Sequence, residues 1–187
     1  MRVVLASASP RRKELLGLLG WEFEIKVSDV EEIVTSSVPS EVVEELSAQK
    51  ARDIFAKEDG DVLVIGADTV VAHKNKILGK PKDDADAVAM LKALSGDSHE
   101  VYTGVTLCKR MQGKESIVTF HECTKVNFYE LSEEDIQWYI STGDHKDKAG
   151  SYGIQSYGVR FVKSICGDYN NVVGLPVARV FAESRSI

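Results

Sequence analysis

Residues 62–71 form the segment that most limits how this chain can fold. The run Val62–Val71 is apolar and rich in β-branched side chains, and its only strongly polar residue is Asp68. Such a run is typical of a strand that is covered on both faces, as in a sheet that lies between helices. Because strand and helix patterns alternate around it, we expect an α/β fold with a mixed sheet.

The other elements follow from local patterns of apolar residues, caps and turns. The patterns predict further strands at 3–6, 21–27, 77–78, 100–110, 116–129 and 159–165. They predict helices at 10–19, 40–57, 84–94, 132–143 and 176–184, with Ser40 and Asp84 as caps and a capping box at Ser132. Residues 111–114 join two long strands into a hairpin, and residues 144–156 are expected to form a loop. We expect one domain over residues 1–187, with two lobes.

Composition excludes several classes of partner. The chain has 187 residues, is 43% hydrophobic and carries a formal net charge of −6. That charge argues against binding to nucleic acids or anionic membranes, but not against a small cationic pocket for one nucleotide. The apolar runs are too short for a signal peptide or a membrane span, so we interpret the protein as cytoplasmic. Cys108, Cys123 and Cys166 are widely separated, which favours buried free thiols over disulfides.

The N-terminal segment concentrates positive charge at the start of a helix. Ser9 is positioned to cap a helix whose first turn contains Arg11, Arg12 and Lys13. The helix dipole disfavours each cation there by about 0.3–1 kcal/mol. A bound anion would reverse that penalty, and free backbone N–H groups, the Ser7 hydroxyl and the guanidiniums could all bind it. This segment therefore predicts a phosphate site, and a solvated basic turn is the alternative.

Asp68 is the second candidate, because a carboxylate inside an apolar strand is costly unless it is hydrogen-bonded, paired or metal-bound. Functional carboxylates occur at strand ends in open α/β sheets. The alternative is a structural Asp whose carboxylate accepts hydrogen bonds from backbone N–H groups of a loop. The acidic loop Ser28–Glu32 has the hard oxygen ligands that Mg²⁺ or Mn²⁺ prefers, or is ordinary solvated surface. Lys50 and Lys80 could each reach a phosphate or be ordinary surface charges.

A late glycine-containing loop, Ala149–Gln155, could recognise a base. Its glycines permit close approach, and Tyr152 could flank the ring. The amide of Gln155 offers one donor and one acceptor, which complement the imide edge of uracil or thymine. A turn-forming Gln in a purely structural loop is the alternative.

Taken together and in this order, these segments resemble the Maf family of nucleoside triphosphate pyrophosphatases. The resemblance covers essentially the whole chain and rests on these motifs: Ser7-x-Ser9-Pro10-Arg11-Arg12, Lys50-Ala51, Gly66–Val71, Gly79-Lys80-Pro81, Leu94-Ser95-Gly96 with His99 and Val101–Gly104, Lys148–Gln155 and Gly167–Pro176. It implies an elongated mixed β-sheet flanked by helices, in two lobes with a central cleft. It also implies hydrolysis of a nucleoside triphosphate to the monophosphate and pyrophosphate, with a divalent cation, Mg²⁺ or Mn²⁺.

The resemblance also implies roles for particular residues. Asp68 falls on the family's proton acceptor, and Asp68 and Glu31 are the implied metal ligands. Five residues fall on phosphate-binding positions: Ser7, Arg11, Arg12, Lys50 and Lys80. Three fall on positions that set substrate specificity: Arg12, Thr69 and Gln155. The late loop is similar to the branch that acts on dTTP and UTP. The segment Asp144–Asp147 departs from the small-residue run that is usual before this loop.

Two other functions remain open at this stage. The chain could be a nucleotide-binding regulator of cell division and septum formation without significant catalysis. It could instead remove non-standard purine nucleotides, although Gln155 favours pyrimidines, including modified pyrimidine analogues. A homodimer is compatible with the sequence, but no sequence feature identifies an interface.

Overall fold

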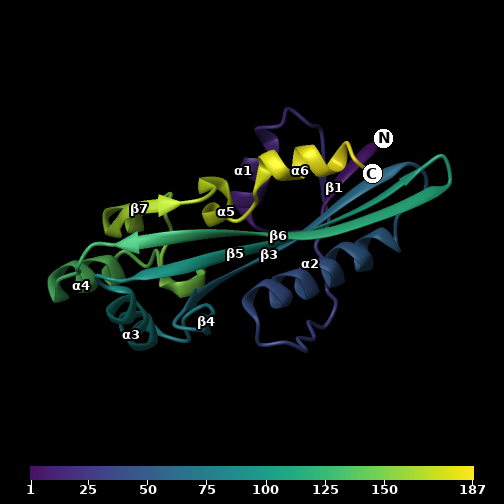
Figure 1. Cartoon of the computed structure of the whole chain (residues 1–187). Coiled ribbons are helices and arrows are strands. Elements are labelled where there is room, and N and C mark those ends of the chain that lie inside the picture. The colour runs from purple at the N-terminus through teal and green to yellow at the C-terminus, as the bar shows by residue number, and fades with distance from the viewer. The chain divides into compact units, whose positions relative to one another are not determined.

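The computed structural model describes all residues 1–187, and its strands pair in one mixed sheet flanked by helices (Figure 1). The seven strands are β1 (Arg2–Leu5), β2 (Glu24–Ile25), β3 (Val62–His73), β4 (Lys76–Leu78), β5 (Ser98–Met111), β6 (Lys114–Phe128) and β7 (Val162–Cys166). Their order is β2-β1-β3-β5-β6-β7, with β4 paired to β3. β1 runs parallel to β2 and β3, whereas β4 and β7 are antiparallel to their neighbours. The mixed α/β prediction is confirmed.

Six α-helices and two 3₁₀ helices surround these strands. They are α1 (Pro10–Gly17), α2 (Pro39–Phe55), α3 (Asp84–Leu94), α4 (Glu133–Ser141), α5 (Tyr169–Val173), α6 (Val177–Ser184), η1 (Ala149–Ser151) and η2 (Tyr157–Phe161). The predicted caps at Ser9 and Ser132 are confirmed, since each side chain accepts from a backbone N–H in the first turn. None of the helices combines the length and apolarity that crossing a bilayer requires.

The chain divides into two compact units, each assembled from separate segments. The first unit contains residues 1–68, 103–122 and 174–187, and the second contains residues 69–102 and 123–173. Strands β3, β5 and β6 each contribute residues to both units. The boundary on β3 falls between Asp68 and Thr69, two residues that the sequence singled out.

In the first unit, α2 packs so closely on the sheet that two strand positions accept only glycine. A Cβ on Gly66 of β3 would lie 2.5 Å from the Ser47 carbonyl oxygen. A Cβ on Gly104 of β5 would lie 2.2 Å from the Val43 carbonyl oxygen. These positions therefore set the distance between the helix backbone and the strands. Buried aliphatic residues of β1, α2 and β3, among them Val4, Ile54 and Val64, fill the core around this contact.

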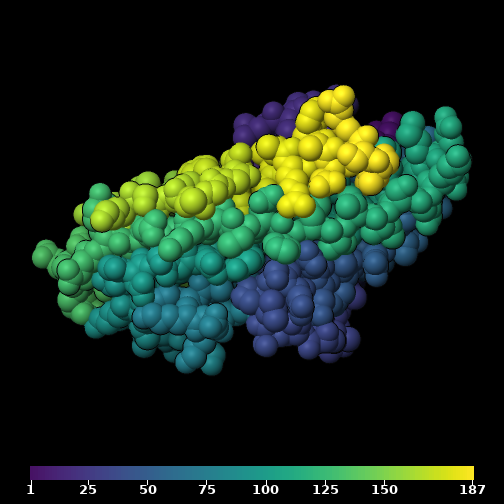
Figure 2. All heavy atoms as spheres, viewed as in Figure 1, coloured from purple at the N-terminus to yellow at the C-terminus, as the bar shows by residue number.

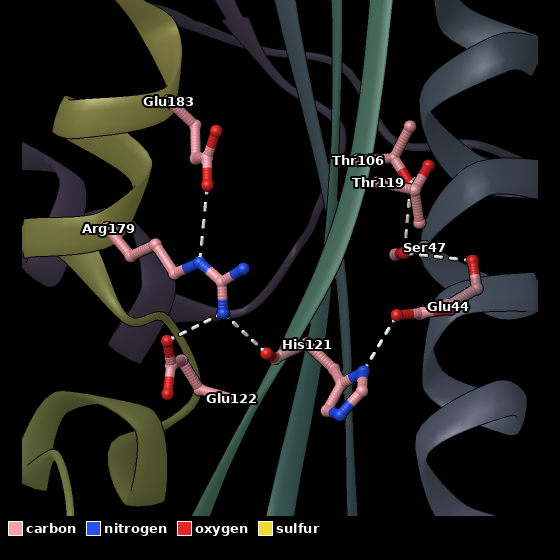
Figure 3. A network of polar contacts seen from close by, with 8 residues as sticks. All are labelled: Glu44, Ser47, Thr106, Thr119, His121, Glu122, Arg179 and Glu183. Carbon is pink, nitrogen blue, oxygen red and sulfur yellow. Dashed lines mark hydrogen bonds and ion pairs between the residues drawn. The ribbon is translucent and has the colours of Figure 1, made fainter.

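Helices α1 and α6 cover the other face of the strands in the first unit, as Figures 1 and 2 show. The ring of Phe181 on α6 lies 6.1 Å from that of Trp21, which follows α1, measured between centroids. Arg179 on α6 donates to the His121 carbonyl oxygen and to Glu122, both at 2.8 Å, and to Glu183 at 3.4 Å (Figure 3). These bonds attach α6 to β6.

The opposite face of β6 is tied to α2. The Nδ1 atom of His121 lies 2.7 Å from Glu44 Oε1, and Ser47 Oγ lies 3.0 Å from Thr106 Oγ1 (Figure 3). Thr106 in turn lies 3.0 Å from Thr119, oxygen to oxygen, so these hydroxyls link α2, β5 and β6. Ser47 and Thr106 are fully buried, and their mutual bonds satisfy polar groups that would otherwise be costly inside the core.

The second unit has an aromatic core. Tyr139 and Phe161 are among its largest fully buried side chains, and their ring centroids are 5.0 Å apart. Phe128 of β6 packs edge-on against His99 and Tyr152, with centroids 4.8 and 4.7 Å away. Helix α3 contacts both α4, which carries Tyr139, and the short η1.

Several sequence predictions were wrong in detail. Only Glu24–Ile25 of the predicted strand 21–27 is paired, through Val4 and Leu5 of β1, and the pairing stops where β1 ends at Leu5. The predicted strand at 159–165 begins at Val162, since residues 157–161 form η2. Proline starts α2 at Pro39, so Ser40 lies inside the helix and does not cap it.

Other corrections concern side chains and one helix. Asp83, one residue before the predicted Asp84, caps α3 by accepting from the Asp86 N–H. Helix α5 was not predicted. Cys108 is buried as expected, but Cys123 and Cys166 are exposed, because both lie on outward-facing positions of paired strands.

Candidate functional site

The start of α1 has the geometry that the N-terminal motif predicted. The Ser9 hydroxyl accepts from the Arg12 backbone N–H at 3.4 Å, which fixes the first turn. Ser7 is nearly buried, and its hydroxyl accepts from Arg12 Nη1 at 3.2 Å. Arg12 Nε also donates to the Gly174 carbonyl oxygen at 2.9 Å. Arg12 is therefore held rigidly at the helix N-terminus, where backbone N–H groups also favour an anion.

Helix α2 and strand β3 bring a lysine onto Asp68. Lys50 Nζ lies 2.5 Å from Asp68 Oδ1 and 2.9 Å from Glu32 Oε1. The side chains of Lys50 and Asp68 are 18% and 16% exposed, so this pair is well shielded from solvent yet still reachable. Gly66 allows the pairing, because residues 66 and 68 share one face of β3 and the missing Cβ lets α2 approach.

The pKa of Arg12 responds both to its neighbours on α1 and to the carboxylates near Lys50. Burial lowers the pKa of Arg12, and the neighbouring Arg11 lowers it further, whereas Asp68 and Glu32 raise it. Arg11, Asp68 and Glu32 are thus close enough to Arg12 to affect its charge. The first unit therefore brings the basic turn at the start of α1 near the carboxylates of Asp68 and Glu32. An array of cations beside a carboxylate is suited to bind a polyphosphate and to act on water next to it.

The acidic loop contributes Glu32 rather than Glu31 to the contact with Lys50. Glu31 is exposed, one residue away. No group of three or more His, Cys, Asp or Glu side chains is arranged to hold a metal ion. Asp68 with Glu31 or Glu32 would nevertheless provide enough protein ligands for Mg²⁺. This ion is commonly bound by only one or two carboxylates, while substrate phosphates and water complete its coordination shell.

The second unit contains Thr69, Lys80 and Gln155. Thr69 is half-buried on β3, whereas Lys80 and Gln155 are exposed. The Gly150 N–H donates to the Gly79 carbonyl oxygen at 3.0 Å, so the turn that carries Lys80 is bonded to the loop that carries Gln155. The backbone is left-handed at Gly150, with φ of +66°, and a Cβ there would lie 3.1 Å from Val71. This close approach explains a glycine at that position.

Tyr152 does not have the exposed position that stacking on a base would require. It is 6% exposed and packs in the aromatic core, and its hydroxyl lies 2.7 Å from Nε2 of the buried His99. The pKa of His99 is lowered to about 4, chiefly by burial and to a smaller extent by His73, while Asp97 opposes the shift. The prediction that Tyr152 flanks a base was wrong, because its aromatic ring fills the space between His99 and Phe128.

Sequence reasoning missed Asp144 as a polar centre of the second unit. Its carboxylate accepts from Tyr139 Oη at 2.9 Å, Ser156 Oγ at 2.5 Å and Lys148 Nζ at 3.0 Å. Burial raises the pKa of Asp144, but the hydrogen bonds from these three groups outweigh it, and the net shift is downward. The one available signal was the concentration of charged and polar residues at 144–147, directly before the late loop.

Comparison with known proteins places the chain among relatives of one kind. It is 52% identical over 199 residues to a dTTP/UTP pyrophosphatase from Agathobacter rectalis, covering all of this chain and 97% of that protein. It is 51% identical over 185 residues to a dTTP/UTP pyrophosphatase from Bacillus thuringiensis, covering 98% of this chain and 94% of that protein. A solved HAM1 protein from Coxiella burnetii is 16% identical, with a TM-score of 0.49 over 98% of this chain and 99% of that chain, too distant a likeness to bear on chemistry.

The family model described as Maf-like protein matches residues 2–187. This match extends over both compact units and includes every candidate residue described above. The chain therefore belongs to the Maf-like protein family.

Proposed function

We propose that this protein hydrolyses nucleoside triphosphates, chiefly dTTP and UTP and their modified analogues, to the monophosphate and pyrophosphate. The observation that carries the proposal is the shielded Lys50–Asp68 pair beside the rigid Arg12 turn. Relatives that share about half of its residues over nearly the whole chain are named dTTP/UTP pyrophosphatases. The geometry is consistent with hydrolysis of a phosphoanhydride, and the names of the relatives support both this reaction and the substrate class.

Asp68 is the proposed general base. Its carboxylate takes a proton from water as the water oxygen forms a bond to the α-phosphorus and the α–β anhydride bond breaks. Lys50, at 2.5 Å from Oδ1, holds the carboxylate in one orientation on β3. Glu32 in turn holds Lys50 from the other side, at 2.9 Å.

The cations of the site neutralise the triphosphate and the pyrophosphate that leaves. We assign phosphate binding to Ser7, Arg11, Arg12, Lys50 and Lys80. Preorganised donors are effective because they need no rearrangement as charge develops. Arg12 meets this condition best, since Ser7 and the Gly174 carbonyl oxygen already fix its guanidinium.

A divalent cation, Mg²⁺ or Mn²⁺, would be held by Asp68 together with Glu31 or Glu32, and would supply further neutralisation of phosphate oxygens. Of the two glutamates, Glu32 already contacts Lys50.

Base selection is assigned to Arg12, Thr69 and Gln155. The Gln155 amide can donate to a carbonyl oxygen and accept from the imide N–H of uracil or thymine. Its side chain is exposed and therefore accessible to a ligand. Cytosine lacks the imide N–H and purines have a different outline, so both should be poorer substrates.

The test is a panel of nucleoside triphosphates, incubated with the protein and Mg²⁺, in which pyrophosphate and monophosphate are measured. We expect dTTP and UTP to be hydrolysed fastest. In Asp68→Asn, turnover should fall by about 10²–10⁴-fold, the range for loss of a general base, while calorimetric affinity for dTTP is retained. Asp59→Asn, an exposed change in the same unit, is the matched control. Unchanged turnover in Asp68→Asn would refute its role.

The same panel separates the alternatives. Binding of dTTP without release of pyrophosphate would indicate the cell-division regulator, and preferential hydrolysis of non-standard purine nucleotides would indicate the purine enzyme. The single domain over residues 1–187 and a homodimer stay predictions, and sedimentation analysis tests the latter.

A further inference from the structure

We propose that Asp144 is a positioning residue that holds Gln155 in place and thereby sharpens the choice of base. This inference rests on the proposed function. It concerns a residue that lies outside the catalytic and binding set named above, in the segment that leads into the loop carrying Gln155.

The Asp144 carboxylate accepts hydrogen bonds from three residues of the second unit. Tyr139 belongs to α4, Lys148 precedes η1, and Ser156 directly follows Gln155 in the chain. The Asp144 side chain is 14% exposed, so these bonds are largely shielded from water. Bonds to a charged acceptor are also stronger than bonds between neutral groups. Asp144 therefore anchors the end of the loop to a regular helix.

Lys148 holds the start of the loop segment 144–156 through two hydrogen bonds to Asp144. Its ammonium donates both to the Asp144 carboxylate, at 3.0 Å, and to the Asp144 carbonyl oxygen, at 2.5 Å. Its aliphatic stem lies over Gly153, where a Cβ would be 2.6 Å from Lys148 Cε. Ser156 donates to the Gly153 carbonyl oxygen from both its backbone N–H and its hydroxyl, each at 3.3 Å. Residues 153–156 thus form a compact turn around the exposed Gln155.

The loop is also fixed on the N-terminal side of Gln155. Tyr152 is buried against His99, and Ile154 is 7% exposed. Gln155 is therefore an exposed residue between buried Ile154 and anchored Ser156. Because the direction of its side chain depends on the backbone at these two neighbours, loss of the Ser156 bond would free the amide to sample other orientations.

A loosened amide should affect base recognition more than the chemical step. Recognition by a buried or fixed polar group depends on its exact placement, and misplacement reduces discrimination between related substrates. Asp68 and Lys50 belong to the first unit, whereas this loop belongs to the second. We therefore expect the effect mainly in KM and in the preference among bases.

The experiment compares Ser156→Ala with wild type, using steady-state hydrolysis of dTTP and dCTP. Ser156→Ala should raise KM for dTTP about tenfold with kcat within about twofold, and should lower the dTTP-over-dCTP ratio of kcat/KM at least fivefold. Ser156→Thr keeps the hydroxyl and should restore both values. Ser141→Ala removes an exposed hydroxyl that bonds only the Trp138 carbonyl oxygen nearby, and is the matched control.

A second variant tests Asp144 by removing the hydrogen bond that it accepts from α4. Tyr139→Phe removes one donor to Asp144 and leaves the loop sequence intact, so it should lower the dTTP-over-dCTP ratio in the same direction. Melting temperatures of all variants show whether folding is retained.

The outcomes distinguish the two proposals. If wild type hydrolyses dTTP and folded Ser156→Ala keeps the wild-type KM and base preference, the role of Asp144 is overturned and the proposed function stands. If Ser156→Ala loses kcat alone, positioning of the base is also overturned. If wild type hydrolyses no triphosphate, the proposed function fails and this inference fails with it.

Discussion

Replacing Gly66 by alanine should damage stability and catalysis together, because one methyl group would separate α2 from β3. The new Cβ would lie 2.5 Å from the Ser47 carbonyl oxygen, 2.7 Å from the Ala51 nitrogen and 2.8 Å from the Ala51 Cβ. Two of these atoms belong to backbone, so a side-chain rotation cannot relieve the overlap. The helix must move by about 1 Å to reach an ordinary contact distance. Overpacking of this kind costs about 1–3 kcal/mol, and backbone contacts favour the upper end.

The same movement would withdraw Lys50 from Asp68, which it contacts at 2.5 Å. A displacement of about 1 Å can reduce catalysis about 10²-fold, even when the changed residue does not touch the substrate. For a chain of this size, a loss of about 2–3 kcal/mol lowers Tm by about 4–12 °C. We therefore expect Gly66→Ala to show both effects in calorimetry and in dTTP hydrolysis.

The matched control is Gly17→Ala, at the end of α1, where an added Cβ has nothing within 4 Å. It should match or slightly exceed the wild-type Tm, since alanine stabilises helical backbone relative to glycine. Gly66→Ala with a wild-type Tm and wild-type kcat/KM would refute the argument that this close approach sets the Lys50–Asp68 geometry.

Two further predictions concern buried titratable groups. Burial lowers the pKa of His99 to about 4, below the 6.5 of an exposed histidine, so the unfolded chain binds more protons between these values. The stability that neutral His99 contributes is therefore lost as pH falls from about 6.5 to 4, by about 3 kcal/mol at most. In urea unfolding, the free energy of unfolding of His99→Gln should decline less over this pH range than that of wild type. An equal decline in both proteins would contradict this. Burial also raises the pKa of Cys108 to about 11. An aromatic disulfide reagent should therefore titrate only Cys123 and Cys166 before unfolding, and rapid reaction of three thiols would show that Cys108 is accessible.

The elements with strong local signals were predictable from sequence. The buried run at β3, the hairpin of β5 and β6, and the caps at Ser9 and Ser132 each depend on residues that are neighbours in the chain. Helix α5 was missed because five residues show too little periodicity to identify a helix. The strand predicted at 21–27 depended on a partner, and its pairing ends where β1 ends.

The candidate site was predictable as a set of residues but not as a set of contacts. Lys50 and Asp68 were both singled out, yet only the packing of α2 on Gly66 shows that they pair. The choice of Glu32 over its neighbour Glu31 depends on how the acidic loop approaches α2. Tyr152 was given an exposed role because the sequence does not show which aromatic residues fill the core of the second unit.

The division of the chain into interleaved segments bears on the order in which the protein forms during synthesis. Every segment of the second unit has been translated by residue 173, whereas the first unit still lacks α6. Domains fold as they emerge, at about 5–20 residues per second, so the unit that holds the N-terminus is the later one to be completed. Until residues 174–187 emerge, Arg12 lacks its Gly174 partner and β6 lacks Arg179. A nascent chain paused before this point would therefore hold a completed second unit and a first unit in which the turn at the start of α1 still lacks its Gly174 partner.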